Sequence, residues 1–212
     1  MGKTKDQILN TALNLFNEQG VADVSIRQIA SAMGISHGNL IYHFKHKSEI
    51  IQALHEALLT RAIQINERID REDFDLLHLY KTTLRGFAAV YEYRFFFYDL
   101  LYIANNDPLL GKTLREVEKL RAQMYREVIA LSIQRGLMLP EAYSGQYEDL
   151  ITWIRIYSDH WLSSAAMYDS ESAEVIIEKY ARLLVKQFYG YLTPVGQAAL
   201  AKAGLIPQES QP

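Results

Sequence analysis

The stretch Ser25–Lys47, SIRQIASAMGISHGNLIYHFKHK, constrains the fold more than any other part of this 212-residue chain. Ser25 is a favoured helix N-cap, and Gln28 follows three residues later, as in a capping box. Apolar side chains then recur at helical spacing, at Ile26, Ile29, Ala30 and Met33. Gly34 can adopt the left-handed conformation that ends a helix, and Ser36 can cap the next one. The pattern predicts two short amphipathic helices joined by a tight turn.

The second helix of this pair has an apolar face that can pack against the rest of the domain and a polar face that can point to solvent. Leu40, Ile41 and Phe44 are available to pack it down. The outward face and the residues after it are polar, aromatic or cationic: His37, Gly38, Asn39, Tyr42, Lys45 and Lys47. This arrangement is typical of a helix-turn-helix, in which one helix reads bases in the major groove and nearby cations neutralise phosphates.

Residues 4–55 resemble the DNA-binding domain of the tetracycline-repressor (TetR) family of transcriptional regulators. The resemblance rests on three segments in register, ALNLFNEQGVADVSIRQIA, GIS and GNLIYHFKHKSEII. It implies backbone contacts from the first helix of the pair and base contacts from the second, with a phosphate held at the start of the next helix. Together with the spacing, it gives the predicted DNA-binding set: Ser25, Arg27, Ser36, His37, Gly38, Asn39, Tyr42, His43 and Lys47. The chain departs from the family at Ile41, where an aromatic residue is usual.

Composition limits the other classes of function. The net charge of the chain is -3, and residues 1–50 hold five Lys or Arg against four acids. This balance fits a protein that makes a few specific DNA contacts better than a polycation that coats DNA nonspecifically. The chain has no cysteine, which excludes disulfides and cysteine-based metal or redox sites. No signal-like run begins the chain, and no window approaches 18 uncharged apolar residues. We therefore expect a cytoplasmic protein without a membrane partner.

Helical periodicity extends over the rest of the chain, and no alternating strand pattern appears. The fold class predicted is all-α, with a three-helix DNA-binding domain at residues 1–47 and a larger helical effector-binding and dimerisation domain at 48–212. Within the second domain, residues 48–68 form a connecting helix, and the charged stretch 67–73 reads as a solvated turn. The predicted helices cover about 4–19, 48–68, 75–93, 95–104, 109–135, 150–168 and 171–191, with a short one in the tail.

The last two long helices carry apolar stripes that could pair with a second copy. The predicted dimerisation residues are Leu150, Ile154, Val175, Tyr180, Leu184 and Phe188. The same periodicity would arise if both stripes faced the core of the monomer. The family resemblance favours a homodimer, and two recognition helices related by a twofold axis could read both halves of a palindrome.

Aromatic residues are concentrated in the body, including three successive phenylalanines at 95–97, which cannot all face one way on a helix. Rings of this kind could line an apolar pocket for a small effector. The predicted ligand-binding residues are Tyr98, Tyr102, Trp153, Tyr157, His160 and Trp161. The alternative is that each ring simply fills the core.

Enzymatic chemistry has no recognisable constellation here, because no nucleophile elbow, phosphate-binding glycine loop or pair of catalytic acids is present. His43 and His46 have the spacing of metal ligands, but without cysteine and with only Glu49 nearby we expect neither metal nor cofactor. The sequence pattern and the family resemblance together predict a homodimeric repressor that binds a palindromic double-stranded operator and is released by an apolar or aromatic effector. The alternative is a DNA-binding adaptor that acts through a protein partner.

Overall fold

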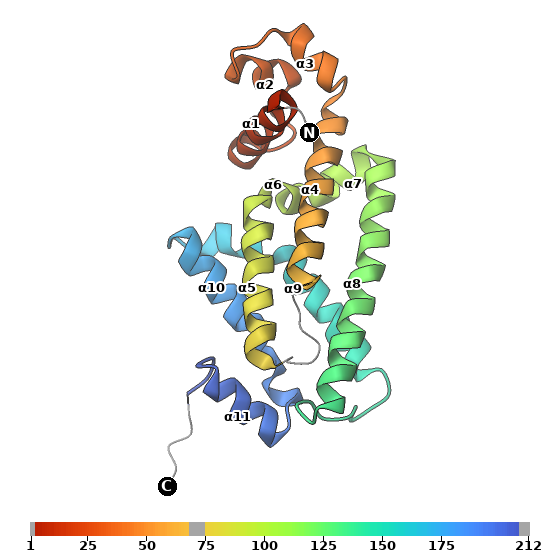
Figure 1. The fold of residues 1–212 in the computed structure, drawn as a ribbon, viewed down its shortest axis with the longest axis vertical. Helices are drawn as coiled ribbons and strands as arrows, with labels where there is room; N and C mark the ends of the chain where they lie inside the picture. The colour runs from red at the N-terminus through yellow and green to blue at the C-terminus, as the bar shows by residue number, and fades with distance from the viewer. Residues whose placement is uncertain (1–2, 68–74, 208–212) are drawn as a thin grey trace. The chain divides into compact units, whose positions relative to one another are not determined.

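The computed structural model describes residues 3–67 and 75–207, and these residues are mostly helical. Within these ranges the only strand-like pairing is one isolated antiparallel bridge between Met138 and Leu192. The predicted all-α class is confirmed (Figure 1). Apart from Glu67, the last residue of the fourth helix, the charged stretch expected to form a solvated turn lies outside the described residues.

The helices follow one another in the order that the periodicity predicts. They are α1 (Lys3–Gln19), α2 (Ile26–Ala32), α3 (His37–His43), α4 (Lys47–Glu67), α5 (Leu76–Glu92), α6 (Arg94–Tyr98), α7 (Leu100–Asn106), α8 (Pro108–Gln134), α9 (Gln146–Tyr168), α10 (Ala173–Lys186), the 3₁₀ helix η1 (Gln187–Tyr191) and α11 (Pro194–Lys202). Pro108 begins α8 because its fixed φ suits the first helical turn. Gly136, with a φ of +69°, follows the end of α8.

Two predicted helices differ from the structure. The segment expected as one helix over 95–104 is two helices, α6 and α7, which meet at Asp99, where φ of -103° and ψ of 17° depart from helical values. The helix expected over 171–191 ends at Lys186 and tightens into η1, after which Leu192 forms the bridge to Met138.

Contacts divide the described residues into two compact units. The first comprises those within Met1–Gln64 and Ala89–Leu114, and the second those within Ile65–Ala88 and Arg115–Pro212. The first unit therefore includes most of α4 and all of α6 and α7, in addition to the three-helix head predicted at 1–47. Helices α4, α5 and α8 each contribute residues to both units.

The core of the first unit joins α1 and α4 to α6 through aromatic rings. Phe16 of α1 packs on Phe95, with ring centroids 5.2 Å apart, and both side chains are fully buried. The buried His55 ring of α4 stacks on Phe96 at 5.0 Å. Phe97 is only half-buried, so the three phenylalanines do differ in environment. Consecutive residues of the short helix α6 thus pack against two different helices, α1 and α4.

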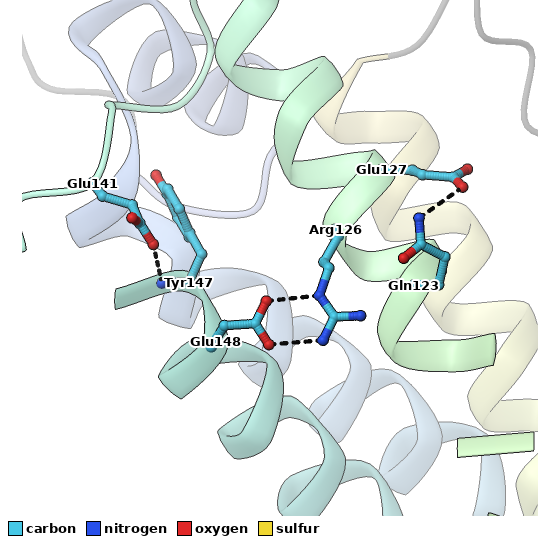
Figure 2. Close-up of polar contacts among 6 residues, drawn as sticks. All are labelled: Gln123, Arg126, Glu127, Glu141, Tyr147 and Glu148. Carbon is cyan, nitrogen blue, oxygen red and sulfur yellow. Dashed lines mark hydrogen bonds and ion pairs between the residues drawn. The ribbon is translucent and has the colours of Figure 1, made fainter. Parts of the chain in front are cut away.

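In the second unit, a bidentate ion pair joins α8 and α9 (Figure 2). The Arg126 guanidinium donates to both carboxylate oxygens of Glu148, at 2.7 and 2.8 Å. Beside it, the carboxylate of Glu141 accepts the Tyr147 backbone N–H in the first turn of α9. The hydrogen bond to Arg126 lowers the pKa of Glu148. Because the pair is exposed, it fixes geometry more than it adds stability.

The predicted dimerisation residues differ in how deeply their own chain buries them. Leu150, Ile154, Tyr180 and Leu184 are buried within their own chain, so they belong to the monomer core and are covered before any second copy arrives. Val175 is 51% exposed, and Phe188 is half-buried in η1. Other apolar side chains of α9 and α10 are exposed instead: Trp153, Ile156, Met167, Tyr168 and Leu183.

Candidate nucleic-acid interface

Helix α2 begins with the capping box that the sequence predicts. The Ser25 hydroxyl oxygen accepts the Gln28 backbone N–H at 3.3 Å, and the Ser25 N–H donates to Gln28 Oε1 at 2.7 Å. Ile29 and Ala30 turn inward and are buried, while Ser25 and Arg27 remain exposed. The inward residues anchor α2, and the exposed pair lies on its solvent side.

The turn to α3 requires a left-handed conformation, which glycine adopts more readily than other residues do. Gly34 has a φ of +66°, and the next amide, that of Ile35, donates to the Ala30 carbonyl at 3.1 Å. The Ser36 hydroxyl then accepts the Asn39 backbone N–H at 3.2 Å and caps α3. These local hydrogen bonds set the angle between the two helices before any tertiary contact is considered.

Helix α3 packs by Leu40 and presents the residues predicted to read DNA. Leu40 and the following C-cap residue Phe44 are buried. Tyr42 is 85% exposed, with its ring edge-on to His43 at 5.2 Å. Four further candidates are exposed at the start of the helix: Ser36, His37, Gly38 and Asn39. His43 and Ile41 are half-buried. A short rigid helix with a polar exposed face has the form needed to enter a major groove.

Lys47 occupies a different position from the other candidates. Its ammonium donates to the backbone carbonyls of Val21 and Val24, at 2.6 and 3.0 Å, and so holds the turn between α1 and α2. Burial lowers the pKa of Lys47, and the charges of Asp23 and Asp99 oppose that shift. Two of the three ammonium donors are therefore used inside the protein, and one is left for a phosphate.

The aromatic ligand candidates of the second unit form a cluster. Trp153 stacks on Tyr157 at 5.2 Å, and Tyr157 donates its hydroxyl to the Tyr180 carbonyl at 2.9 Å. Phe87 stacks on Trp161 at 4.9 Å, with the planes 13° apart, and also contacts Tyr157. His160 is exposed, and Tyr98 and Tyr102 belong to the first unit, where both are partly exposed.

Trp161 has an unusual environment within this cluster. Its side chain is 2% exposed, yet Nε1 has no hydrogen-bond partner among the described residues. Burying an N–H without an acceptor costs free energy, so an acceptor supplied from outside would be favourable. Sequence reasoning missed Phe87, which stacks on this ring, and assigned Tyr180 to a dimer surface. Nothing in the α5 sequence distinguishes Phe87 from an ordinary core residue.

Sequence reasoning also missed a group of charged residues between α8 and α9. Arg121 donates to Asp159 at 2.9 Å and lies 3.3 Å from Glu118, and Arg155 lies 3.7 Å from the same glutamate. Burial raises the pKa of Glu118, an effect that Arg121 partly offsets. The spacing of Glu118 and Arg121 is a common helix-surface pattern, and their partners come from a helix distant in sequence. Among the described residues, no helix is long and apolar enough to cross a membrane, and no group of histidines and acids could hold a metal ion.

Comparison with known proteins places these features in a family. A profile described as "Bacterial regulatory proteins, tetR family" matches residues 8–54, and one described as "Bacterial transcriptional repressor" matches residues 52–200. The second match alone covers more than half of the chain. The chain belongs to the TetR family. The families whose profiles match are families of transcriptional regulators, not of enzymes.

Relatives agree with this TetR-family assignment mainly in the head. The HTH-type transcriptional regulator AcrR of Shigella flexneri is 41% identical over 54 residues, which are 26% of this chain and 25% of that protein. Tetracycline repressor protein class C of Escherichia coli is 32% identical over 85 residues, 40% of this chain and 36% of that protein. The matched segments thus span only about a quarter to a third of these curated relatives.

Solved structures extend the TetR-family likeness to the whole fold. A TetR-family transcriptional regulator from Marinobacter aquaeolei VT8 has a TM-score of 0.86 at 24% identity, covering 96% of this chain and 98% of that one. A SmeT–triclosan complex has a TM-score of 0.65 at 16% identity, covering 100% of this chain and 98% of that one. At these identities the likeness establishes the fold alone.

Proposed function

We propose that the protein is a homodimeric repressor that binds a palindromic operator and leaves it when a small apolar or aromatic effector binds. The observation that carries the DNA-binding part is the exposed face of α3, held at a fixed angle to α2 by the Ser25 and Ser36 caps and the Gly34 turn. One helix of this length spans too few base pairs for a selective site, so a twofold copy is needed. Because its ligand is operator DNA, we place the repressor in the cytoplasm.

We propose that α3 contributes the base contacts and that its neighbours contribute phosphate contacts. The base-reading residues are His37, Gly38, Asn39, Tyr42 and His43, which lie on or beside the exposed face of the helix. Arg27 and Ser25 on the α2 side, with Ser36 at the start of α3, lie where a phosphate backbone would pass. Lys47 has one donor left for the same purpose.

We propose that the aromatic cluster of the second unit binds the effector. The buried Trp161 ring with its unpaired Nε1–H favours a flat apolar molecule that carries a hydrogen-bond acceptor. Tyr157 and Trp153 extend the same stack. The SmeT complex with triclosan offers a chemically suitable first probe. Tyr98, Tyr102 and His160 remain further candidates for ligand contact.

Selection of bound duplexes from a randomised DNA pool tests the DNA-binding part. The purified full-length protein is mixed with the pool, bound duplexes are recovered, and the enriched sequences are read. We expect a palindrome whose half-sites lie about one helical turn apart. Enrichment of a single half-site would contradict binding as a dimer. No enrichment at all would contradict sequence-specific DNA binding.

Displacement from the selected duplex tests the effector part. Triclosan and other apolar aromatic compounds are titrated into the protein–operator complex, and operator binding is followed by fluorescence anisotropy. Effector release predicts that at least one such compound weakens binding about 5- to 150-fold, the usual range of coupling between two sites. A compound that quenches tryptophan emission but leaves operator affinity unchanged would contradict it.

A further inference from the structure

Asn17 of α1 bonds to both sides of the break between α5 and α6. Its Nδ2 donates to the Glu92 carbonyl at 2.8 Å, and its Oδ1 accepts the Phe95 backbone N–H at 3.0 Å. The last carbonyls of a helix and the first amides of the next have no partner within their own helices. One amide side chain satisfies one group of each kind here. A carboxylate or a hydrocarbon of similar size could not serve both.

Asp99 makes a second link at the other end of α6. Its carboxylate accepts the Val21 backbone N–H at 2.8 Å, in the turn that follows α1. The carbonyl of the same Val21 accepts the ammonium of Lys47. The turn that leads into α2 is therefore held by α4 on one side and by the α6–α7 junction on the other. The head is joined to α6 through α1 as well as through α4.

Helix α5 connects this junction to the aromatic cluster of the second unit through an unbroken helix. Phe87, which stacks on Trp161, precedes Glu92 by five residues on the same helix. A rotation or shift of α5 at Phe87 would move the Glu92 carbonyl to which Asn17 is bonded. Packed helices transmit such small movements because they resist bending.

We infer that Asn17 is a positioning residue for DNA recognition: it makes the placement of α2 and α3 depend on how Phe87 of α5 packs against Trp161 of α9. This inference rests on the proposed function, because it explains how the cluster and the head influence one another. A second hydrogen bond, from Gln52 of α4 to Asp107 at 3.0 Å, provides the competing route. The inference assigns the coupling to α1 and not to this α4 contact.

The test uses operator DNA as the probe, because coupling between two sites acts equally in both directions. The full chain carries Trp153→Phe, so that Trp161 is the only tryptophan, and binds the duplex recovered by selection. We expect operator binding to change Trp161 emission and to slow amide exchange at Phe95. With Asn17→Ala added, the emission change should fall about fivefold or more, the lower end of usual coupling. Asn14→Ala, at an exposed position of the same helix, is the matched control and should change neither signal.

Two further variants separate the routes. Gln52→Ala should keep the Trp161 response if α1 carries the coupling. Asn17→Asp keeps the acceptor for Phe95 and removes the donor to Glu92, so it should keep Phe95 protection and lose the Trp161 response. This variant also serves if Asn17→Ala fails to fold, as judged by circular dichroism. The inference is overturned if the Asn17 variants keep the full response or if Gln52→Ala alone abolishes it.

Two controls, wild type and the Trp153→Phe protein without further change, distinguish failure of this inference from failure of the proposed function. If the Trp153→Phe protein binds operator without any change at Trp161, the coupling is absent and DNA recognition stands. If wild type binds no duplex, both the proposed function and the inference are refuted.

Discussion

Lys47 has two candidate roles, one in DNA binding and one in the structure of the head. The family resemblance assigns it to a DNA phosphate, whereas its ammonium already bonds two carbonyls of the α1–α2 turn. Hydrogen bonds from a charged donor to carbonyls in a partly buried site contribute more than those between neutral groups. We therefore regard Lys47 as a residue that shapes the head before it meets DNA.

Replacing Lys47 with methionine separates the two roles. We expect Lys47→Met to lower the free energy of unfolding by about 1 to 3 kcal/mol, because two carbonyls lose a charged donor. Urea unfolding measures this effect, with Lys45→Ala at an exposed position as the control. Unchanged stability combined with weaker, less salt-dependent DNA binding would assign Lys47 to the phosphate alone.

Arg27 and Asn39 should affect DNA binding in different ways. Arg27→Ala removes one charged phosphate contact from each protomer, so the log–log salt slope of a dimer should become shallower by roughly 2. Asn39→Ala should change the selected sequence with little effect on that slope, because base contacts carry sequence information. Affinities at several salt concentrations and a repeated duplex selection measure both. An identical slope for Arg27→Ala would exclude it from the phosphate contacts.

The residues of the head were predictable because their structure is local. A cap lies three residues from its partner and the turn needs one glycine, so Ser25, Gly34 and Ser36 can be recognised in the sequence. The links from Asn17, Asp99 and Lys47 were not predictable. Their partners are distant in sequence or are backbone atoms, which no side-chain pattern marks.

At the scale of elements, periodicity identified the helices but not always which way they face. It located α9 and α10, yet most of the stripe assigned to a partner faces the interior. An apolar stripe has the same spacing whether it covers a core or an interface. The kink at Asp99 also escaped prediction, because an aspartate within an apolar helix resembles a solvent-facing residue until its partner, Val21, is known.

The backbone of α11 passes close to the backbone of Leu137 at Gly196. A Cβ added at Gly196 would lie 2.1 Å from the Leu137 carbonyl oxygen, which cannot move away easily because it also accepts the Thr193 N–H. We expect Gly196→Ala to destabilise the protein by about 1 to 3 kcal/mol, the usual cost of overpacking. Thermal or urea unfolding measures this. Gly190→Ala is the matched control, since its Cβ would meet nothing within 4 Å.

The contact between α4 and α6 should weaken in acid. Burial lowers the pKa of His55 below its ordinary value of 6.5, so below about pH 6.5 the unfolded chain takes up a proton that the folded protein resists. Stability is fully present above this pH and is lost as the pH falls toward the folded pKa. We expect His55→Phe, which keeps a ring on Phe96, to lose less stability than wild type between pH 7.5 and 5.5. Equal losses in urea unfolding would exclude His55 as a cause.

At the scale of the whole molecule, we propose that a second copy packs on exposed apolar side chains of α9 and α10, among them Ile156, Met167 and Leu183. Ile156→Glu would bury an unpaired charge there, so we expect the dimer dissociation constant to rise on the order of 100-fold or more. Sedimentation at several concentrations measures this, and operator affinity should fall with it. Ala130→Glu, at an exposed position of α8, is the control. A stable Ile156→Glu dimer would place the interface elsewhere.

The hydrogen bonds of Asn17 also bear on how such regulators can be recombined. A chimaera joined near residue 53, where the two family profiles meet, would keep Asn17 and replace the Glu92 and Phe95 backbone groups to which it bonds. The grafted head would then fold and bind its operator, but effector binding in the new body would no longer change its operator affinity. A working exchange would have to transplant α6 and the end of α5 together with the head, as one discontinuous cassette.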